Sequence, residues 1–341
     1  MKKKLSANIK CLILSVLLLS GFNMGLLSQK TINGVINKYA HVTGIGVDNV
    51  TVADEAQFDQ FKANDTILLI QMKGVRIYST EIASYGTPES SYGPAGKFEF
   101  LTILSVDTAI NKITFRNNIL NSTFNVESQV QIIKVPSFIN SANVNTSSLS
   151  CAPWDSLTKT GGVLAAIVGK TLTLNENIDV SGKGFLGGAI TSVLTAICGT
   201  TDPLVYDKYA YHRDYNNSGF KGEGPVIRGY LSSTNFPLIF PGYAKGRGSN
   251  FTGGGGGNGR FSGGGGGSNK GQGGKGGREE NICLPIPQTE GGAGGKSISV
   301  VDFPNTFFMG GGGGSSTYES GATPNPGANG GGIVIIISDD V

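Results

Sequence analysis

Residues that usually carry catalytic or metal chemistry are scarce in this chain of 341 residues. Histidine occurs only at His41 and His212, and neither has a cysteine or a second histidine at the spacing of a zinc site. The 24 acidic residues form no cluster at the end of an expected strand, and neither an HExxH helix motif nor a GxSxG nucleophile elbow occurs. We therefore expect a protein that is not an enzyme, with no catalytic residue, metal or cofactor.

Charge is also sparse, which bears on the kind of partner. Charged residues make up 15% of the chain, and 27 basic against 24 acidic residues leave a net charge of +3. No basic stripe is present, so the electrostatic footprint of a nucleic-acid-binding protein is missing. We expect no nucleic-acid partner.

Long apolar runs are missing beyond the amino terminus. Lys2–Lys4 and Lys10 precede the apolar stretch Cys11–Leu19, in the order typical of a secretory signal peptide. We expect residues 1–28 to be this signal, with cleavage after Ser28, and no membrane span after its removal because a span needs about 20 apolar residues. The sequence thus predicts a secreted or cell-surface protein.

Cysteine is nearly as rare as histidine. Removal of the signal would leave Cys151, Cys198 and Cys283, and export to an oxidising compartment permits one disulfide. We favour Cys198–Cys283, which would close a long loop around the first glycine tracts. Three unpaired, half-buried cysteines remain the alternative.

Short strands dominate residues 29–138, which we expect to form a small β-barrel or sandwich. Thr66–Met72 is mostly apolar, as in a strand buried on both faces, whereas Phe98–Leu104, Lys112–Phe115 and Gln129–Val135 alternate as half-buried strands do. Gly, Asn, Asp and Pro turns separate them. Residues 139–150 are rich in Asn, Ser and Thr and are interpreted as a linker.

A second unit is expected over residues 151–341, with an insertion at 198–240. Its strand candidates are Gly162–Val168 and Thr171–Val180, joined by a turn at Gly169-Lys170, and a last strand at Gly332–Ser338. The sequence predicts a mainly β protein: a barrel or sandwich followed by a glycine-rich β-structure.

What the chain has in abundance is glycine. Between Gly253 and Gly332, 30 of 80 positions are glycine, with five-residue blocks at Gly253–Gly257, Gly263–Gly267 and Gly310–Gly314. Glycine loses the most backbone entropy on ordering, so such tracts are either flexible or fixed by hydrogen bonds between backbones. Because an apolar strand follows directly, we favour a bundle of extended glycine helices of the polyproline II type. Aromatic side chains would pin this bundle to a β-sheet, and the candidates are Phe251, Phe261, Phe307 and Phe308.

Two ligand motifs compete with simpler interpretations. Gly182, Gly184 and Gly187 have the GxGxxG spacing of a dinucleotide site, but no second βαβ unit follows and glycine is too common for the match to be specific. Asp214, Asn216 and Ser218 offer calcium ligands at the first positions of an EF-type loop, yet Pro225 stands where the bidentate glutamate belongs. A solvated polar turn is the favoured interpretation.

A polar-aromatic cluster is the best candidate binding surface. Tyr206, Tyr209, Tyr211 and Tyr215 lie in the insertion beside Lys208 and Arg213. Aromatic rings with polar partners are used in sugar and protein recognition. The alternative is that they pack a long loop onto its own domain.

The glycine-rich segments also resemble a known group of proteins. The segments Asn177–Gly188, Gly219–Gly224, Met309–Gly314 and Gly330–Ile336 are similar to the glycine-rich amino-terminal region of secreted Bacteroidetes surface proteins, which are gliding-motility-associated or adhesin-like. The resemblance implies a non-enzymatic structural or adhesive role, with surface glycans or envelope proteins as partners. A carbohydrate-binding module that uses the tyrosine cluster is the alternative, and an exported hydrolase is a weaker one.

Overall fold

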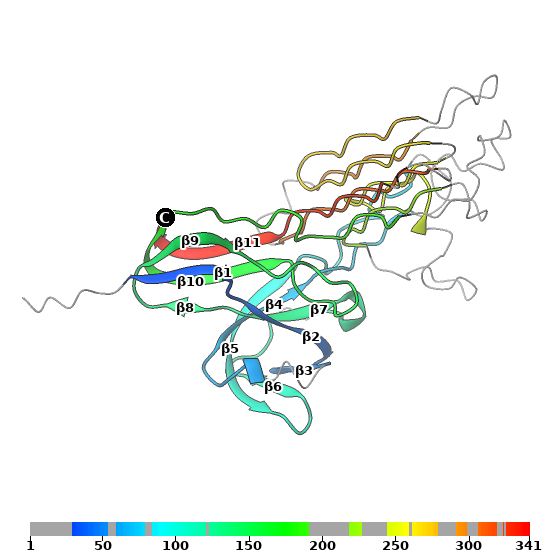
Figure 1. Ribbon diagram of the computed structural model, residues 1–341. Coiled ribbons are helices and arrows are strands. Elements are labelled where there is room, and N and C mark those ends of the chain that lie inside the picture. The colour runs from blue at the N-terminus through cyan, green and yellow to red at the C-terminus, as the bar shows by residue number, and fades with distance from the viewer. Residues whose placement is uncertain are drawn as a thin grey trace, which may run out of the picture.

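A computed structural model gives the fold of the chain. It describes residues 29–53, 59–78, 84–120, 123–190, 218–226, 244–258, 261–278, 291–298, 306–318, 323 and 325–341. The described residues form a closed β-barrel, a curled parallel sheet beside it, and a set of extended glycine-rich segments beyond the sheet (Figure 1). The expectation of a mainly β fold is confirmed.

The barrel is closed by antiparallel pairing in the order β2-β3-β6-β5-β4-β7. Its strands are β2 (Lys38–Ile45), β3 (Asn49–Val52), β4 (Thr66–Gln71), β5 (Phe98–Asp107), β6 (Lys112–Phe115) and β7 (Val130–Lys134), with the short 3-10 helix η2 (Val126–Ser128) before β7. Closure leaves no unpaired edge in this sheet. Aliphatic and aromatic side chains fill the interior of the barrel.

Strand β4 is buried on both faces, as its apolar sequence predicts. Successive side chains of a strand point to opposite faces. Ile67 and Leu69 therefore point into the barrel, while Leu68 and Ile70 point outward and pack against the parallel sheet. These outward-pointing side chains join barrel and sheet in one apolar core, which explains why β4 carries no polar face.

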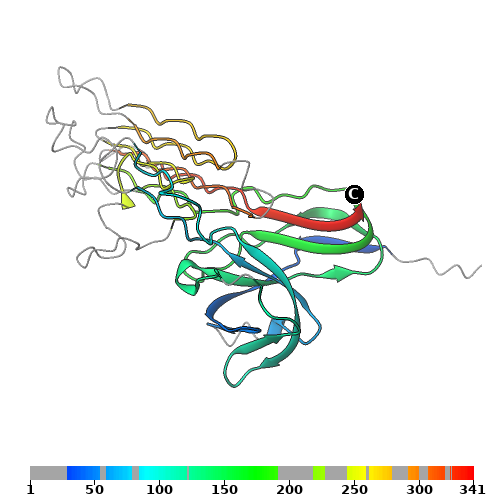
Figure 2. The same ribbon diagram turned by 180° about the vertical axis from the view of Figure 1, so that it is seen from behind.

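The second sheet is parallel, with the strand order β1-β9-β10-β11. Its strands are β1 (Lys30–Val35), β9 (Ala142–Ser150), β10 (Val163–Leu174) and β11 (Ile333–Asp340), and the two-residue β8 (Ser137–Phe138) also pairs with β10. The sheet curls around an apolar core of its own. Figure 2, the view from behind, shows this sheet lying along the barrel, with the glycine-rich segments extending from one end of the sheet.

Three expectations about the organisation of the chain are wrong. The predicted linker 139–150 is strand β9 over most of its length, because Ala142, Val144 and Leu149 are buried while its polar residues face outward. The two strands predicted around Gly169-Lys170 are one strand, β10, whose register shifts between Val168 and Thr171. Strand β1, expected in the first domain, pairs with β9 in the second sheet.

The glycine-rich segments run side by side beyond the sheet as extended chains (Figure 1). We call them the glycine bundle; its described members are residues 184–188, 219–224, 252–258, 262–268, 273–277, 291–296, 309–317 and 325–331. Residues 219–224 were expected within the insertion 198–240, so that boundary is wrong. The described glycines of the tract between 253 and 332 all avoid positive φ.

Hydrogen bonding in the bundle repeats every three residues. The N–H groups of Gly310, Gly313 and Ser316 donate to carbonyls of the segment 325–331 at 2.8–3.1 Å. Those of Gly311, Gly314 and Thr317 donate to the segment 262–268, and those of Gly312 and Ser315 donate to the segment 219–224. A chain with three residues per turn, negative φ and bonds to three different neighbours is a polyproline II-type glycine helix. The glycine-helix prediction is confirmed for these residues.

Only glycine fits at the contacts between these helices. A Cβ atom at Gly314 would lie 1.9 Å from the carbonyl oxygen of Gly255, and one at Gly312 would lie 2.0 Å from that of Leu186. Backbone atoms of a packed neighbour cannot move aside as the end of a side chain can. The glycine blocks are thus a packing requirement, and the bundle is a core made of main chain.

Aromatic side chains attach the bundle to the barrel. The Phe307 ring stacks on that of Phe98 in β5 at a centroid distance of 4.4 Å. Phe251 and Phe308 are buried around Tyr92, at 5.2 and 5.6 Å between centroids. Phe307 therefore packs on a strand as expected, whereas Phe251 and Phe308 pack on Tyr92 in the loop between β4 and β5, and Phe261 is exposed.

Candidate functional site

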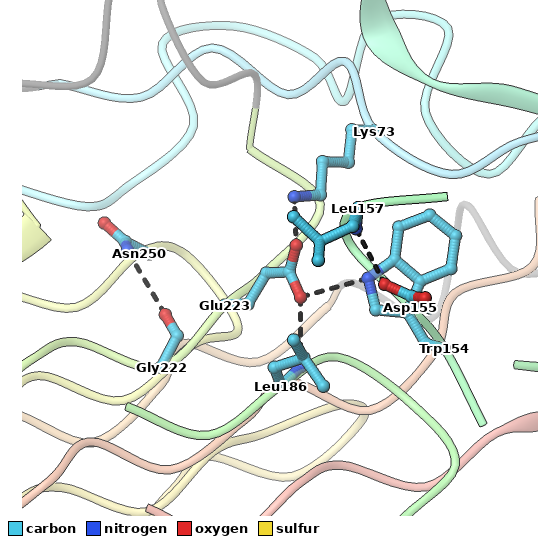
Figure 3. A network of polar contacts seen from close by, with 8 residues as sticks. All are labelled: Lys73, Trp154, Asp155, Leu157, Leu186, Gly222, Glu223 and Asn250. Carbon is cyan, nitrogen blue, oxygen red and sulfur yellow. Dashed lines mark hydrogen bonds and ion pairs between the residues drawn. The ribbon is translucent and has the colours of Figure 1, made fainter. Parts of the chain in front are cut away.

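The most elaborate polar arrangement in the described part of the chain lies where the glycine bundle meets the barrel (Figure 3). We call it the junction network; it consists of Lys73, Trp154, Leu186 and Glu223. Lys73 follows β4, Trp154 follows β9, and Leu186 and Glu223 belong to two different helices of the bundle. The network thus ties together segments that are far apart in the sequence.

The Glu223 carboxylate is the centre of the network. Its Oε1 atom forms an ion pair with Lys73 Nζ, and its Oε2 atom accepts hydrogen bonds from Trp154 Nε1 and Leu186 N, both at 3.0 Å. The side chains of Lys73 and Glu223 are only 2% and 9% exposed. Both oxygens therefore have protein partners, as a buried carboxylate requires.

The surroundings of the pair are apolar and aromatic. The Phe185 ring lies 5.7 Å from Lys73 Nζ and packs edge-on against Trp154 at 6.0 Å between centroids. Met72, Phe185 and Trp154 all belong to the core shared by barrel, sheet and bundle. Charges in such a place are costly to bury and interact strongly, so the loss of either partner would be destabilising. The junction network therefore holds the glycine bundle at a fixed position on the barrel.

Two further side chains in Figure 3 fix the backbone beside the network. Asn250 Nδ2 donates to the carbonyl of Gly222 at 3.2 Å, next to Glu223. Asp155 Oδ1 accepts from Leu157 N at 2.8 Å in the turn that follows Trp154. These bonds position the glycine helix that carries Glu223 and the turn that follows Trp154.

A second buried lysine lies on the same glycine helix as Glu223. Lys221 Nζ donates to the carbonyls of Gly246 and Gly248 at 3.2 and 2.6 Å and lies 4.9 Å from the centroid of the Tyr85 ring. Main-chain carbonyls and an aromatic face are both favourable partners for an ammonium group. These contacts hold the glycine helix that carries Lys221 against Gly246, Gly248 and Tyr85.

Most residues predicted to form a site lie outside the described residues. They are Tyr206, Tyr209, Tyr211 and Tyr215, the calcium candidates Asp214 and Asn216, and the cysteines Cys198 and Cys283. Ser218, the third calcium candidate, is described and buried, and its Oγ atom donates to Asn258 Oδ1 at 2.6 Å. The Tyr cluster and the disulfide remain predictions.

Two of the three glycines of the GxGxxG match have packing roles, whereas Gly182 has open space around it and a left-handed φ of 66°. A Cβ atom at Gly184 would lie 2.1 Å from the carbonyl of Gly331, and one at Gly187 would lie 1.9 Å from that of Gly327. The space that a pyrophosphate would need against this backbone is taken by a neighbouring glycine helix. Packing within the glycine bundle therefore accounts for Gly184 and Gly187 of the GxGxxG spacing.

Cys151 is the one cysteine among the described residues, and it is a buried free thiol. Burial raises its pKa to about 11, so the thiol stays protonated at neutral pH and is a poor nucleophile. The described residues also contain no group of three or more His, Cys, Asp or Glu side chains that could hold a metal ion. Where the chain is described, no helix is long and apolar enough to cross a membrane.

The junction network was missed by reasoning from the sequence. Lys73 and Glu223 are 150 residues apart, and neither belongs to a recognisable motif. One signal was present: Gly219–Gly224 places a lysine and a glutamate among glycines in a tract that otherwise has little charge. An isolated charge within a backbone-packed segment indicates a partner on another element.

Comparisons with protein-family models, with curated proteins and with solved structures found no match for this chain.

Proposed function

We propose that this chain is a secreted, non-enzymatic protein of the cell surface or extracellular matrix, with an adhesin-like structural role. The glycine bundle carries this proposal. Its helices are held by backbone hydrogen bonds to several neighbours at once, and substitution at most inner positions would bring a Cβ atom onto a neighbouring carbonyl. Such a core offers few side chains for chemistry but makes a stiff support.

The signal-like amino terminus supports the location in this proposal. A basic segment followed by an apolar stretch directs export in the usual arrangement of secretory signals. The resemblance to glycine-rich regions of secreted Bacteroidetes surface proteins supports the same placement. Surface glycans or other envelope proteins are the proposed partners.

A carbohydrate-binding module is the second candidate, because four tyrosines occur within ten residues at Tyr206–Tyr215. In the sequence, this segment stands between residues 184–188 and 219–224, which are two helices of the glycine bundle. Tyrosine supplies an apolar ring and a polar hydroxyl, which together suit a sugar.

A glycan array separates the two candidates. The purified chain and the double variant Tyr209→Ala plus Tyr211→Ala would be applied to the same array, with Tyr318→Ala as a matched control outside the cluster. Saturable binding that only the double variant loses favours recognition, whereas no binding across the array favours a scaffold. Surface detection of the chain by antibody on intact cells tests the location, and retention inside the cell would contradict it.

A further inference from the structure

We propose that Lys73 and Glu223 condense to an intramolecular isopeptide bond, which cross-links the segment after β4 to the glycine bundle. The two charged groups are in direct contact and are almost fully buried in the core shared by barrel, sheet and bundle. A buried ion pair carries a large desolvation cost, and a neutral amide removes both charges. This inference does not rest on the proposed surface role.

The reaction is balanced by the two side chains alone. One proton passes from the Lys73 ammonium to the Glu223 carboxylate, giving an amine and a carboxylic acid. The amine nitrogen then attacks Cδ of Glu223, the new C–N bond forms, and the bond from Cδ to Oε1 breaks. Of the three ammonium hydrogens, one stays on the amide nitrogen and two leave with Oε1 as water. No oxidant, reductant or other reactant is needed.

The carboxylate oxygen that remains on Cδ of Glu223, Oε2, already accepts hydrogen bonds of the kind that this condensation requires. Trp154 Nε1 and Leu186 N both donate to Oε2 at 3.0 Å. Attack on Cδ would place negative charge on this oxygen, and two fixed N–H donors would stabilise it as an oxyanion hole does. The packed aromatic surroundings of Trp154 and Phe185 limit the access of water that would reverse the condensation.

An exposed pair in the same chain provides a control. Lys134 Nζ and Asp65 Oδ2 lie 2.7 Å apart, but their side chains are 29% and 20% exposed. Water solvates both charges there, so the ionic form costs little and no amide is expected. Both pairs are lysine–carboxylate contacts. They differ in burial and in the two N–H groups that donate to the second carboxylate oxygen of Glu223.

Peptide mapping of the full-length purified chain tests the proposal. Trypsin should release residues 63–76 joined to residues 222–228, with no cleavage after Lys73 and a mass one water below the sum of the two peptides. Fragmentation would place the link between Lys73 and Glu223. Separate linear peptides, cleaved after Lys73, would overturn the proposal.

Variants check the chemistry. Lys73→Arg should abolish the linked peptide because a guanidinium does not condense in this way, and Lys134→Arg should leave it unchanged. Trp154→Phe removes one oxyanion donor and should slow its formation by about a hundredfold in a time course after synthesis. Formation at the wild-type rate in Trp154→Phe would overturn the role given to that indole.

Discussion

At the scale of single residues, the lack of a side chain is what matters most in this protein. The inner glycines of the bundle approach neighbouring carbonyls so closely that a single methyl group would overlap them, whereas glycines on the outer helix 273–277 include positions with open space. The effect of a glycine substitution should therefore depend on where the Cβ atom points. The local sequence, which is glycine-rich in both places, does not distinguish them.

Gly314→Ala tests this directly. Its Cβ atom would lie 1.9 Å from the Gly255 carbonyl oxygen, so we expect a loss of about 3 kcal/mol or more in the free energy of unfolding. Gly274→Ala meets nothing within 4 Å and should change that free energy by about 1 kcal/mol at most, in either direction. Urea denaturation of both variants measures the difference, and equal losses would contradict the packing account.

We expect the His41 side chain to make the stability of the protein depend on pH. It lies on β2 and is buried, its Nε2 atom has no hydrogen-bond partner, and burial together with nearby Lys159 lowers its pKa to about 4. In the unfolded chain the histidine pKa is 6.5, so the unfolded state binds the proton more readily than the folded state. The contribution of neutral His41 to the free energy of unfolding is therefore full above pH 6.5 and is lost as the pH falls toward 4.

The pH dependence can be isolated with one variant. His41→Leu should lose less stability than the wild type between pH 6.5 and pH 4, because the leucine binds no proton. Denaturation midpoints at several pH values in this window provide the measurement. Parallel curves for the two proteins would show that His41 does not titrate as described.

At the scale of elements, burial on two faces explains which strands the sequence reveals. Strand β4 was predicted within one residue of its bounds, and β6 was predicted at its bounds, because their apolar patterns are strong. Strand β9 was interpreted as a linker because its sequence is rich in Asn, Ser and Thr. In the structure these residues take the outward positions, and only three of the nine residues are buried. A strand with one solvated face and few large apolar residues resembles a loop in composition.

Strand β11 offers a test of this alternation. Ile335 is 8% exposed and packs in the core shared with the barrel, whereas Ile337 is 46% exposed. We expect Ile335→Ala to cost about 2–4 kcal/mol of the free energy of unfolding and Ile337→Ala about 1 kcal/mol or less. Thermal or urea denaturation compares them, and a larger loss for Ile337→Ala would show that the register of β11 is wrong.

At the scale of the whole molecule, the barrel, the sheet and the bundle share buried surfaces. Leu68 of β4, Ala165 of β10 and Met309 of the bundle all belong to one apolar core. The sequence predicted a barrel or sandwich followed by a glycine-rich β-structure, together with the glycine helices, because composition and apolar runs report on them. It did not predict that β1 crosses to the second sheet, nor that Lys73 meets Glu223, since both depend on contacts between distant segments.

Hydrogen exchange of the glycine amides is the most direct test of the central claim, which is that the glycine tracts form an ordered bundle of threefold helices. The amides of Gly254, Gly255 and Gly312–Gly314 donate to backbone carbonyls of neighbouring helices, so they should exchange far more slowly than those of an unstructured glycine-rich peptide of the same sequence. Exchange throughout these blocks at the rate of the peptide would contradict the bundle.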